Sequence, residues 1–466
     1  MKTLDVAIVG GGAAGLAAAL TLWDRGVRDI LIIEREHSLG GILRQCIHEG
    51  FGLIRFGENL SGPEYARRFI EEIEKRVIPY CCDTAVTDIS PQKVLTLVSR
   101  REGLVKIQTK AVILTMGCRE RTRGQLAIPG ERPAGVFTAG VAQAYMNLYN
   151  TKLGNDVVIL GSGDVGLIMA RRLTLEGSRV KGVYEILPHP SGLPRNIAQC
   201  LDDYGIPLYL SHTVTEIVGD RRINGVKISA VDKDLQAISG TERFVSCDTL
   251  ILSVGLIPEN ELSAGAGVIL DEKTKGALVD GANQTNVPGI FAAGNARYVH
   301  DLVDNVSLDG EKTALAAAAW LKGTLSASLI PANPDSASSE TPRFFPKPGA
   351  RLIRCILCPN GCDLEVVAQG EQILSVTGNR CPKGVEYAES EIRHPMRTFA
   401  SSVSVEGGEL PLVSVRLSAP VPRDRIFDVM EEIKKIRLKA PVRIGDIACK
   451  NVLGLESDVV VTKTLK

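Results

Sequence analysis

The sequence lacks a net charge and any long hydrophobic run. Its 54 Lys and Arg residues are balanced by 54 Asp and Glu residues. Nucleic-acid-binding proteins usually carry a basic excess, so nucleic-acid recognition is excluded as the main function. The most apolar stretches, Ala13–Leu20 and Ala314–Leu321, are far shorter than the roughly 18 residues that a membrane-spanning helix needs. We therefore expect no direct membrane insertion.

We also expect no targeting segment. The chain begins Met1-Lys2-Thr3 and enters an apolar run that glycine soon interrupts, which is not the pattern of a signal peptide. The 11 cysteines are an odd number, which argues against a fully paired extracellular framework. The composition, 44% hydrophobic and 23% charged, excludes a mostly disordered chain. We expect a cytoplasmic protein of several domains.

Glycine is abundant, with 46 residues in 466, and part of it lies in a repeated pattern. Residues 4–34 and 156–185 each read as an apolar run, a G-x-G-x-x-G motif, an amphipathic helix and a second apolar run that ends in Glu. The distance from the first glycine to that Glu is 34 − 10 = 24 residues in one copy and 185 − 161 = 24 in the other. Two such motifs with equal spacing predict two nucleotide-binding domains.

The residues that follow the first motif carry a family resemblance. Ala111–Arg119 reads AVILTMGCR and Asn286–Asn295 reads NVPGIFAAGN. With the paired motifs, these segments resemble the pyridine nucleotide–disulfide oxidoreductase superfamily over about residues 1–325. The resemblance implies FAD at the first motif and NAD(P)H at the second. The FAD contacts implied are Gly10, Gly12, Ala13, Ala14, Gly15, Glu34, Arg35, Gly41, Thr115, Gly117, Gly294 and Asn295.

Asn295 stands where the family usually has Asp, so it keeps an acceptor oxygen for a flavin ribityl hydroxyl and loses the charge. The family pattern also places the start of a helix near Asp309. At the second motif, Glu185 can pair with a free ribose 2′-hydroxyl and would repel a 2′-phosphate, which favours NAD(H) over NADP(H). The NAD contacts expected are Gly161, Gly163, Asp164, Gly166, Glu185 and Gly255.

Residues 1–325 lack the closely spaced cysteine pair of a disulfide reductase. Cys46 is alone in its segment, Cys200 and Cys247 are far apart, and the adjacent Cys81 and Cys82 would face opposite sides of a strand. We therefore expect no thiol–disulfide cycle in this part. Cys46 is a candidate catalytic thiolate near the flavin, and a buried structural cysteine is the alternative.

A second cysteine group lies beyond a proline-rich segment. Cys355, Cys358 and Cys362 form C-x₂-C-x₃-C, and Cys381 follows with a proline after it. This pattern suits the four ligands of a [4Fe–4S] cluster; zinc and unligated thiols remain alternatives. Cys355–Arg397 resembles the small cluster-binding domain of molybdopterin oxidoreductases, including His394-Pro-x-Arg397, and the whole tail resembles an uncharacterised four-cysteine domain.

These observations predict an α/β protein with two Rossmann-like dinucleotide-binding domains and a small α+β cysteine domain. Short strands are expected at Ile373–Val376, Ser402–Val405 and Leu412–Leu417, and a helix at about Arg423–Lys435. The predicted divisions are an FAD-binding domain (1–125 plus 280–330), an NAD-binding domain (126–279), a Pro/Ser-rich linker (331–349) and the cysteine domain (350–466).

The function predicted is electron transfer between NADH, FAD and a C-terminal [4Fe–4S] cluster, to or from a partner protein. Gly40–Leu53 resembles relatives that accompany a flavoprotein dehydrogenase acting on glycerol 3-phosphate, which implies such a partner subunit. One alternative is an NADH-dependent thiol reductase that uses the C-terminal cysteines. Another is a non-catalytic metal-handling or assembly protein.

Overall fold

The computed structural model describes residues 2–325 and 350–466, so the predicted linker at 331–349 lies outside the described residues. The contacts divide the chain into two compact units, with breaks between residues 119 and 120 and between residues 255 and 256. Unit 1 holds the beginning of the chain and the segment that follows residue 255; unit 2 holds the segment between the breaks and the C-terminal part. The narrower domain boundaries stay a prediction. Within the described ranges, every helix is too short or too polar to pass through a bilayer.

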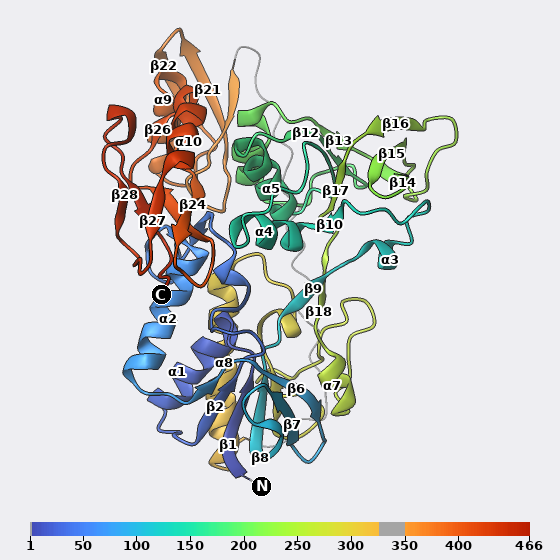
Figure 1. The fold of residues 1–466 in the computed structure, drawn as a ribbon, viewed down its shortest axis with the longest axis vertical. Helices are drawn as coiled ribbons and strands as arrows, with labels where there is room; N and C mark the ends of the chain where they lie inside the picture. The colour runs from blue at the N-terminus through green and yellow to red at the C-terminus, as the bar shows by residue number, and fades with distance from the viewer. Residues whose placement is uncertain (1, 326–349) are drawn as a thin grey trace. The chain divides into compact units, whose positions relative to one another are not determined.

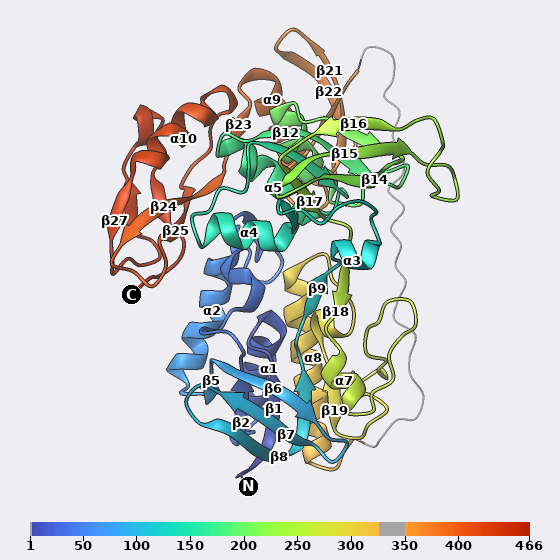
Figure 2. The ribbon, with the colours of Figure 1, turned by 45° about the vertical axis from the view of Figure 1, so that its right-hand side comes forward.

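Unit 1 is built on a seven-stranded sheet with the order β5-β2-β1-β8-β7-β6, and β19 also pairs with β8. Val6 and Ile8 of β1 pack with α1 and α8 on one face, and Ala7 and Val9 pack in a second core on the other. Both views show α1 and α8 side by side against the sheet (Figures 1 and 2). The strands are β1 (Lys2–Val9), β2 (Ile30–Ile33), β5 (Tyr80–Cys81), β6 (Thr84–Ile89), β7 (Val94–Ser99), β8 (Gly103–Leu114) and β19 (Ile290–Ala292).

The helices of unit 1 follow the sequence pattern closely, with one exception. The helix expected to begin near Asp309 begins six residues earlier, at Val303. No proline or glycine lies between Val303 and Asp309, so the helix extends through this segment without a break. Gly310 lies inside this helix, where a Cβ would come within 2.3 Å of the Ala14 carbonyl oxygen, so glycine serves close helix packing here. The helices are α1 (Ala13–Asp24), α2 (Gly62–Lys75), α7 (Glu261–Gly265) and α8 (Val303–Leu321).

Unit 2 begins with a second, five-stranded parallel sheet of order β10-β17-β11-β12-β13. A three-stranded antiparallel sheet, β14-β15-β16, extends this part. The strands are β10 (Val136–Thr138), β11 (Asp156–Leu160), β12 (Arg179–Glu185), β13 (Leu208–Leu210), β14 (His212–Gly219), β15 (Ile223–Ala230), β16 (Arg243–Ser246) and β17 (Thr249–Leu252). The helices are α3 (Arg123–Leu126), α4 (Ala139–Asn147), α5 (Asp164–Leu175) and α6 (Pro194–Cys200). This is the second Rossmann-like fold, so the predicted α/β class is confirmed.

Besides a two-stranded pairing of β23 (Met396–Arg397) with β26 (Val421–Pro422), the C-terminal part of unit 2 contains two small sheets, each with a helix. The first has the order β20-β21-β22 and the second β27-β24-β25-β29-β28. Their strands are β20 (Arg351–Arg354), β21 (Asp363–Gln369), β22 (Gln372–Thr377), β24 (Ala400–Glu406), β25 (Leu412–Leu417), β27 (Arg437–Lys439), β28 (Ile447–Cys449) and β29 (Val459–Val461), and their helices α9 (Lys383–Arg393) and α10 (Ile426–Lys435). The three predicted strands and the predicted helix are confirmed, the helix with a 3₁₀ turn before it.

Within unit 2, the C-terminal part shares a core with the second Rossmann-like fold. Leu175 of α5 belongs to the hydrophobic cluster formed by β24, β25 and α10. Nearby, Tyr204 meets Phe427 edge to face, with ring centroids 6.1 Å apart. The buried Arg397 guanidinium binds both carboxylate oxygens of Asp203 at 2.5 and 2.7 Å and also contacts Glu391. Hydrophobic packing and buried charge therefore both join these parts.

Candidate dinucleotide and cysteine sites

The two G-x-G-x-x-G motifs fold into loops of the same construction. Each follows a parallel strand of its sheet and leads into a helix, β1 into α1 and β11 into α5. A Cβ on Gly15 would come within 1.9 Å of the Gly10 carbonyl oxygen, and one on Gly166 within 2.5 Å of Ser253. Only glycine fits at these two positions, since the helix and the loop touch there.

The two closing glutamates occupy equivalent positions. Glu34 accepts a hydrogen bond from the Gly11 amide at 2.8 Å, and Glu185 accepts one from the Ser162 amide at 2.9 Å. Both are buried, and each also accepts from the amide two residues further along the chain. A carboxylate has about four lone-pair sites, so Glu34, with two amide donors, retains capacity for ribose hydroxyls. Glu185 also accepts from the Ser162 and Ser191 hydroxyls, which a ribose would have to displace. The geometry therefore places an acceptor beside each glycine loop.

The first loop fits the pyrophosphate of FAD. The nearest atom to a Cβ built on Gly12 is the Gly41 Cα, 4.0 Å away, so bare backbone faces bare backbone. Ala13 and Ala14 begin α1, whose first amides have no intrahelical acceptor. A helix N-terminus with free amides binds phosphate groups. The predicted contacts Gly10, Gly12, Ala13, Ala14, Gly15 and Gly41 thus lie together.

The other predicted FAD residues differ in exposure and in their hydrogen-bond partners. The Thr115 hydroxyl is 2.9 Å from the carbonyl oxygens of Val9 and Gly10, so it hydrogen-bonds to the backbone at the start of the glycine loop. Arg35 is exposed, and space is open beside Gly117. Asn295 accepts from the His300 amide at 3.1 Å, while its own amide lies 3.5 Å from the Cys118 sulfur. Thr115 and Asn295 therefore already have protein partners.

A buried carboxylate that the sequence analysis missed lies under this segment. Asp309 accepts hydrogen bonds from the Gly294 amide at 2.7 Å and from Asn283 at 2.8 Å, and pairs with Arg297 at 3.2 Å. Burial alone would raise the pKa of Asp309, but His300, Arg297 and the Gly294 amide together lower it to about 2. Asp309 is therefore an ionised carboxylate that holds the Gly294 amide, one residue before Asn295.

The second loop has its own unpredicted supports. The hydroxyls of Ser162 and Ser191 donate to Glu185 at 2.5 and 3.2 Å, and Ser253 accepts from the Gly166 amide at 3.0 Å. Asp164 accepts from the Leu193 amide at 2.7 Å and from Asn196, so it fixes the start of α6. The predicted NAD contacts Gly161, Gly163, Asp164, Gly166 and Glu185 lie together, and the Gly255 carbonyl accepts from the Arg121 amide nearby. Of these serines only Ser162 lies inside the glycine motif, so the sequence carried no local signal for Ser191 and Ser253.

Cys46 lies in a tight turn against the start of α2. Its carbonyl accepts from the Gly62 amide, and a Cβ on Gly62 would come within 2.9 Å of the Cys46 Cβ. Burial raises the pKa of the Cys46 thiol to about 12. The thiol is therefore protonated at neutral pH, whereas a redox nucleophile must be a thiolate.

We expect Cys46→Ser to leave NADH-dependent turnover and the flavin absorbance spectrum unchanged within twofold, because a protonated thiol and a hydroxyl have similar size and charge. Steady-state kinetics and absorbance spectra of the purified variant check this. A loss of turnover above tenfold with normal flavin content would restore the catalytic role of Cys46.

The four C-terminal cysteines lie around one loop and the helix after it. Cys355 directly follows β20, its amide donates to the Cys362 carbonyl at 2.9 Å, and Cys381 is exposed just before α9. Burial raises the pKa of Cys355, and the charges of Cys358, Cys362 and Cys381 raise it further, so all four lie within electrostatic range. Within residues 2–325 and 350–466, no three Cys, His, Asp or Glu side chains have metal-liganding geometry. The four cysteines therefore suit a four-thiolate site by residue type and by their position around one loop. Their side chains would have to move closer together to bind one metal centre.

Comparison with known families gives two separate matches, which leave the segment between residues 323 and 382 uncovered. The family described as "Pyridine nucleotide-disulphide oxidoreductase" matches residues 4–323. A second family, described as "Protein of unknown function (DUF1667)", matches residues 382–463. All four cysteines lie outside both matches, with Cys381 directly before the second. The resemblance to the cluster-binding domain of molybdopterin oxidoreductases stays a prediction.

Individual relatives match about two thirds of the chain. Hydrogen cyanide synthase subunit HcnB of Pseudomonas protegens is 27% identical over 318 residues, which are 63% of this chain and 66% of that protein. An alkyl hydroperoxide reductase subunit of Staphylococcus aureus is 26% identical over 298 residues, 62% of this chain and 54% of that protein. The crystal structure of T. acidophilum thioredoxin reductase superposes with a TM-score of 0.56 at 25% identity, covering 68% of this chain and 99% of that one. The chain thus spans less than two thirds of the length of these curated relatives.

Proposed function

Because the chain belongs to the pyridine nucleotide-disulphide oxidoreductase family, whose members are FAD-dependent NAD(P)H oxidoreductases, we propose that it passes electrons between NADH, FAD and a [4Fe–4S] cluster. Cys355, Cys358, Cys362 and Cys381 are the proposed ligands. A partner protein would donate or accept the electrons at the cluster.

One contact carries this proposal: the cysteine loop lies against the second dinucleotide fold. A Cβ on Gly361 would come within 3.0 Å of Pro194 and of the Arg195 amide at the start of α6. Burial lowers the pKa of Arg195, and the charge of Cys358 acts in the opposite direction. The same end of α6 is fixed by Asp164, which belongs to the second glycine loop. The cysteine loop therefore adjoins the predicted NAD site through α6.

The protein residues have binding and orienting roles in this scheme. Flavin chemistry would supply, when the cofactor is bound, a two-electron hydride acceptor that can also release single electrons. The Gly12 and Gly41 backbones leave room for its pyrophosphate, and Glu34 would hold its adenosine ribose. Glu185 would hold the ribose of NADH. The buried cation of Arg195 would offset the negative charge of ligating thiolates beside it.

Anaerobic purification with iron, sulfide, zinc and flavin analysis tests the proposal. We expect iron and sulfide in equal amounts, FAD, and bleaching of the flavin absorbance on titration with NADH. Cys381→Ser should abolish iron and sulfide but keep FAD, because Cys381 is exposed and its replacement leaves the cores intact. Cys449→Ser, a change outside the proposed ligand set, is the matched control and should keep both.

The alternatives predict other results. Zinc without iron would reject the cluster. Absence of any metal, with NADH-dependent reduction of a disulfide reagent that Cys381→Ser abolishes, would favour a thiol reductase instead. A protein without FAD, which NADH leaves unchanged, would point to an assembly or metal-handling role.

We further propose a preference for NAD(H) over NADP(H), which rests on the buried Glu185 carboxylate. Glu185→Gln should lower kcat/KM for NADH about tenfold, the effect of losing one charge-assisted hydrogen bond of about 1.4 kcal/mol. It should leave the value for NADPH unchanged or higher, because the repulsion of a 2′-phosphate is removed. Glu34→Gln is the matched control at the first loop, where it should lower flavin content and preserve the NADH to NADPH ratio. An unchanged ratio in Glu185→Gln would contradict the preference.

The partner and the location are also proposals. Both curated relatives carry names as subunits of a larger enzyme, which supports a second protein as the electron donor or acceptor. We propose a flavoprotein dehydrogenase of the type that acts on glycerol 3-phosphate, in the cytoplasm. Co-purification of a tagged chain from its native cells, followed by identification of the bound protein, tests this.

A further inference from the structure

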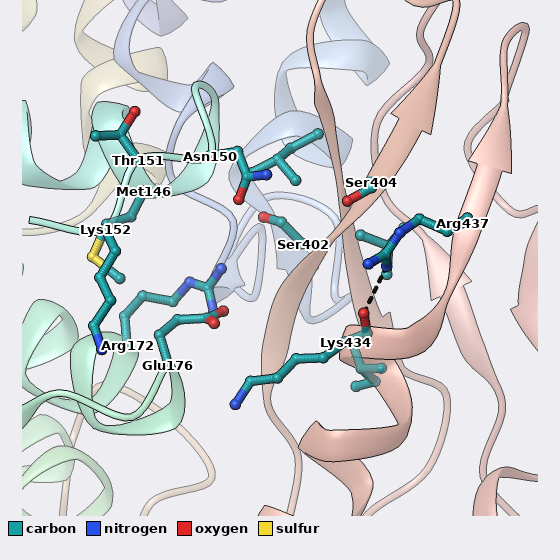
Figure 3. A pocket seen from close by; sticks show the side chains of 13 residues that line it. Met146, Asn150, Thr151, Lys152, Arg172, Glu176, Ser402, Ser404, Lys434 and Arg437 are labelled. Carbon is teal, nitrogen blue, oxygen red and sulfur yellow. Dashed lines mark hydrogen bonds and ion pairs between the residues drawn. The ribbon is translucent and has the colours of Figure 1, made fainter.

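A cavity of about 200 Å³ lies within unit 2, where the second Rossmann-like fold meets the C-terminal part. Its walls come from the end of α4, from α5, from β24 and from the end of α10 (Figure 3). This volume is several times the roughly 30 Å³ share of one water molecule and lies below the roughly 300 Å³ at which sites for drug-sized ligands begin. A ligand of a few non-hydrogen atoms therefore fits.

The cavity carries an excess of positive charge. Lys152, Arg172, Lys434 and Arg437 line it, against a single carboxylate, Glu176. Glu176 is already neutralised, since Arg172 binds it at 2.5 Å. Lys434 pairs with Glu431, three residues earlier on α10. Among the described residues, Lys152 and Arg437 have no carboxylate within ion-pair distance, so an anion entering the cavity meets uncompensated cations.

Hydrogen-bond donors are aimed at the same space. The Ser402 hydroxyl is buried, and the described residues give it no hydrogen-bond partner. A buried hydroxyl without a partner destabilises the fold, and a ligand that accepts its hydrogen bond would remove that cost. Figure 3 shows Ser402, Ser404 and Asn150 turned toward the cavity, with the Arg437 guanidinium on its far wall. Arg437 uses one terminal nitrogen for the carbonyls of Lys434 and Ile436, and its other nitrogens remain available.

We propose that this cavity binds a small phosphate-bearing molecule, either inorganic phosphate or a short phosphate monoester. A phosphate dianion accepts several hydrogen bonds at once, which matches hydroxyl, amide and guanidinium donors around one space better than a carboxylate does. A ligand there would touch both α5 and β24, and so would strengthen the contact between the second Rossmann-like fold and the C-terminal part. This site is independent of the function proposed above.

Isothermal titration calorimetry of the full chain tests the proposal, with FAD bound and NAD⁺ saturating so that both glycine loops are occupied. The probes are inorganic phosphate, phosphoglycolate as a short monoester, and malonate as a carboxylate of similar size. We expect a phosphate probe to bind with a Kd below about 1 mM at low salt, and malonate to bind at least tenfold more weakly. Tighter binding of phosphoglycolate would assign the cavity to an ester, and equal or tighter binding of inorganic phosphate to the free ion.

Two variants locate the binding. Ser402→Ala should weaken the phosphate probe at least tenfold while leaving the melting temperature without ligand unchanged or higher, because an unpartnered buried hydroxyl is removed. Arg437→Met should weaken binding similarly. Lys435→Met, which removes a neighbouring cation that does not line the cavity, is the matched control and should bind as the unchanged protein does. Binding that is equally tight in all three variants, equal affinity for malonate, or no binding at ten times the expected Kd would overturn the proposal.

Discussion

Arg397→Met should lower the free energy of unfolding of unit 2 by about 3–5 kcal/mol, the range for removing one partner of a buried ion pair. The Arg397 side chain is 7% exposed, and its two partners, Asp203 and Glu391, are 6% and 14% exposed. These carboxylates raise the pKa of Arg397 although burial alone would lower it. Without the guanidinium, the two buried carboxylates would keep only the half-exposed Arg423, which lies 3.5 Å from each.

Urea unfolding followed by circular dichroism measures this loss. Arg425→Met is the matched control, because Arg425 pairs with Asp428 on the surface, where an ion pair contributes at most about 1 kcal/mol. Arg397→Lys should recover only part of the stability, since an ammonium cannot bind two carboxylates in the forked geometry. Equal stability of Arg397→Met and Arg425→Met would show that the buried network contributes nothing.

Asp309→Asn should cost about 2.5 kcal/mol of stability at pH 7. A carboxyl group with an ordinary pKa of about 4 that is lowered to about 2 by folding contributes that amount when it is fully ionised. The amide would still accept from Gly294, but it would leave the Arg297 charge without its partner. The change therefore tests whether the ionised Asp309 carboxylate stabilises the segment around Gly294.

The lowered pKa of Asp309 determines how the stability difference between the two proteins should change with pH. The stabilisation is present above the unfolded pKa of about 4 and is lost as the pH falls through about 2, so the difference between the two proteins should shrink in that window. Urea titrations at pH 7, 5 and 3 measure it, with Asp301→Asn, an exposed neighbour, as control. A difference that stays constant from pH 7 to pH 3 would rule out ionised Asp309 as its origin.

The sequence was sufficient for both glycine loops because their geometry is local. A strand, a tight turn and a helix start are encoded in consecutive residues, and the closing Glu34 and Glu185 stand at a fixed distance from their loops. The C-terminal strands were predictable for the same reason, since alternation of apolar residues in Leu412–Leu417 needs no distant partner. Local pattern thus determined the elements and the predicted binding loops.

Contacts between distant segments could not be predicted from the sequence. Arg397 looked like part of a His394-Pro-x-Arg397 motif, yet its partner Asp203 lies 194 residues away and its guanidinium is fully used there. Asp309 looked like a helix start, and it is a buried acceptor inside α8. A buried carboxylate needs partners that only the folded chain brings together. No periodicity in one sequence reveals such partners.

The shared core at Leu175 has a consequence for how this chain can be recombined. A tail that ends in its own closed core can be moved between proteins as a module, whereas this tail completes its hydrophobic cluster with a side chain from α5. Grafting residues 350–466 onto another flavoprotein would leave an unfilled position in that cluster and would leave Arg397 without its Asp203 counterpart. Modular exchange would therefore have to transfer the surface of α5 and the Asp203 turn together with the tail.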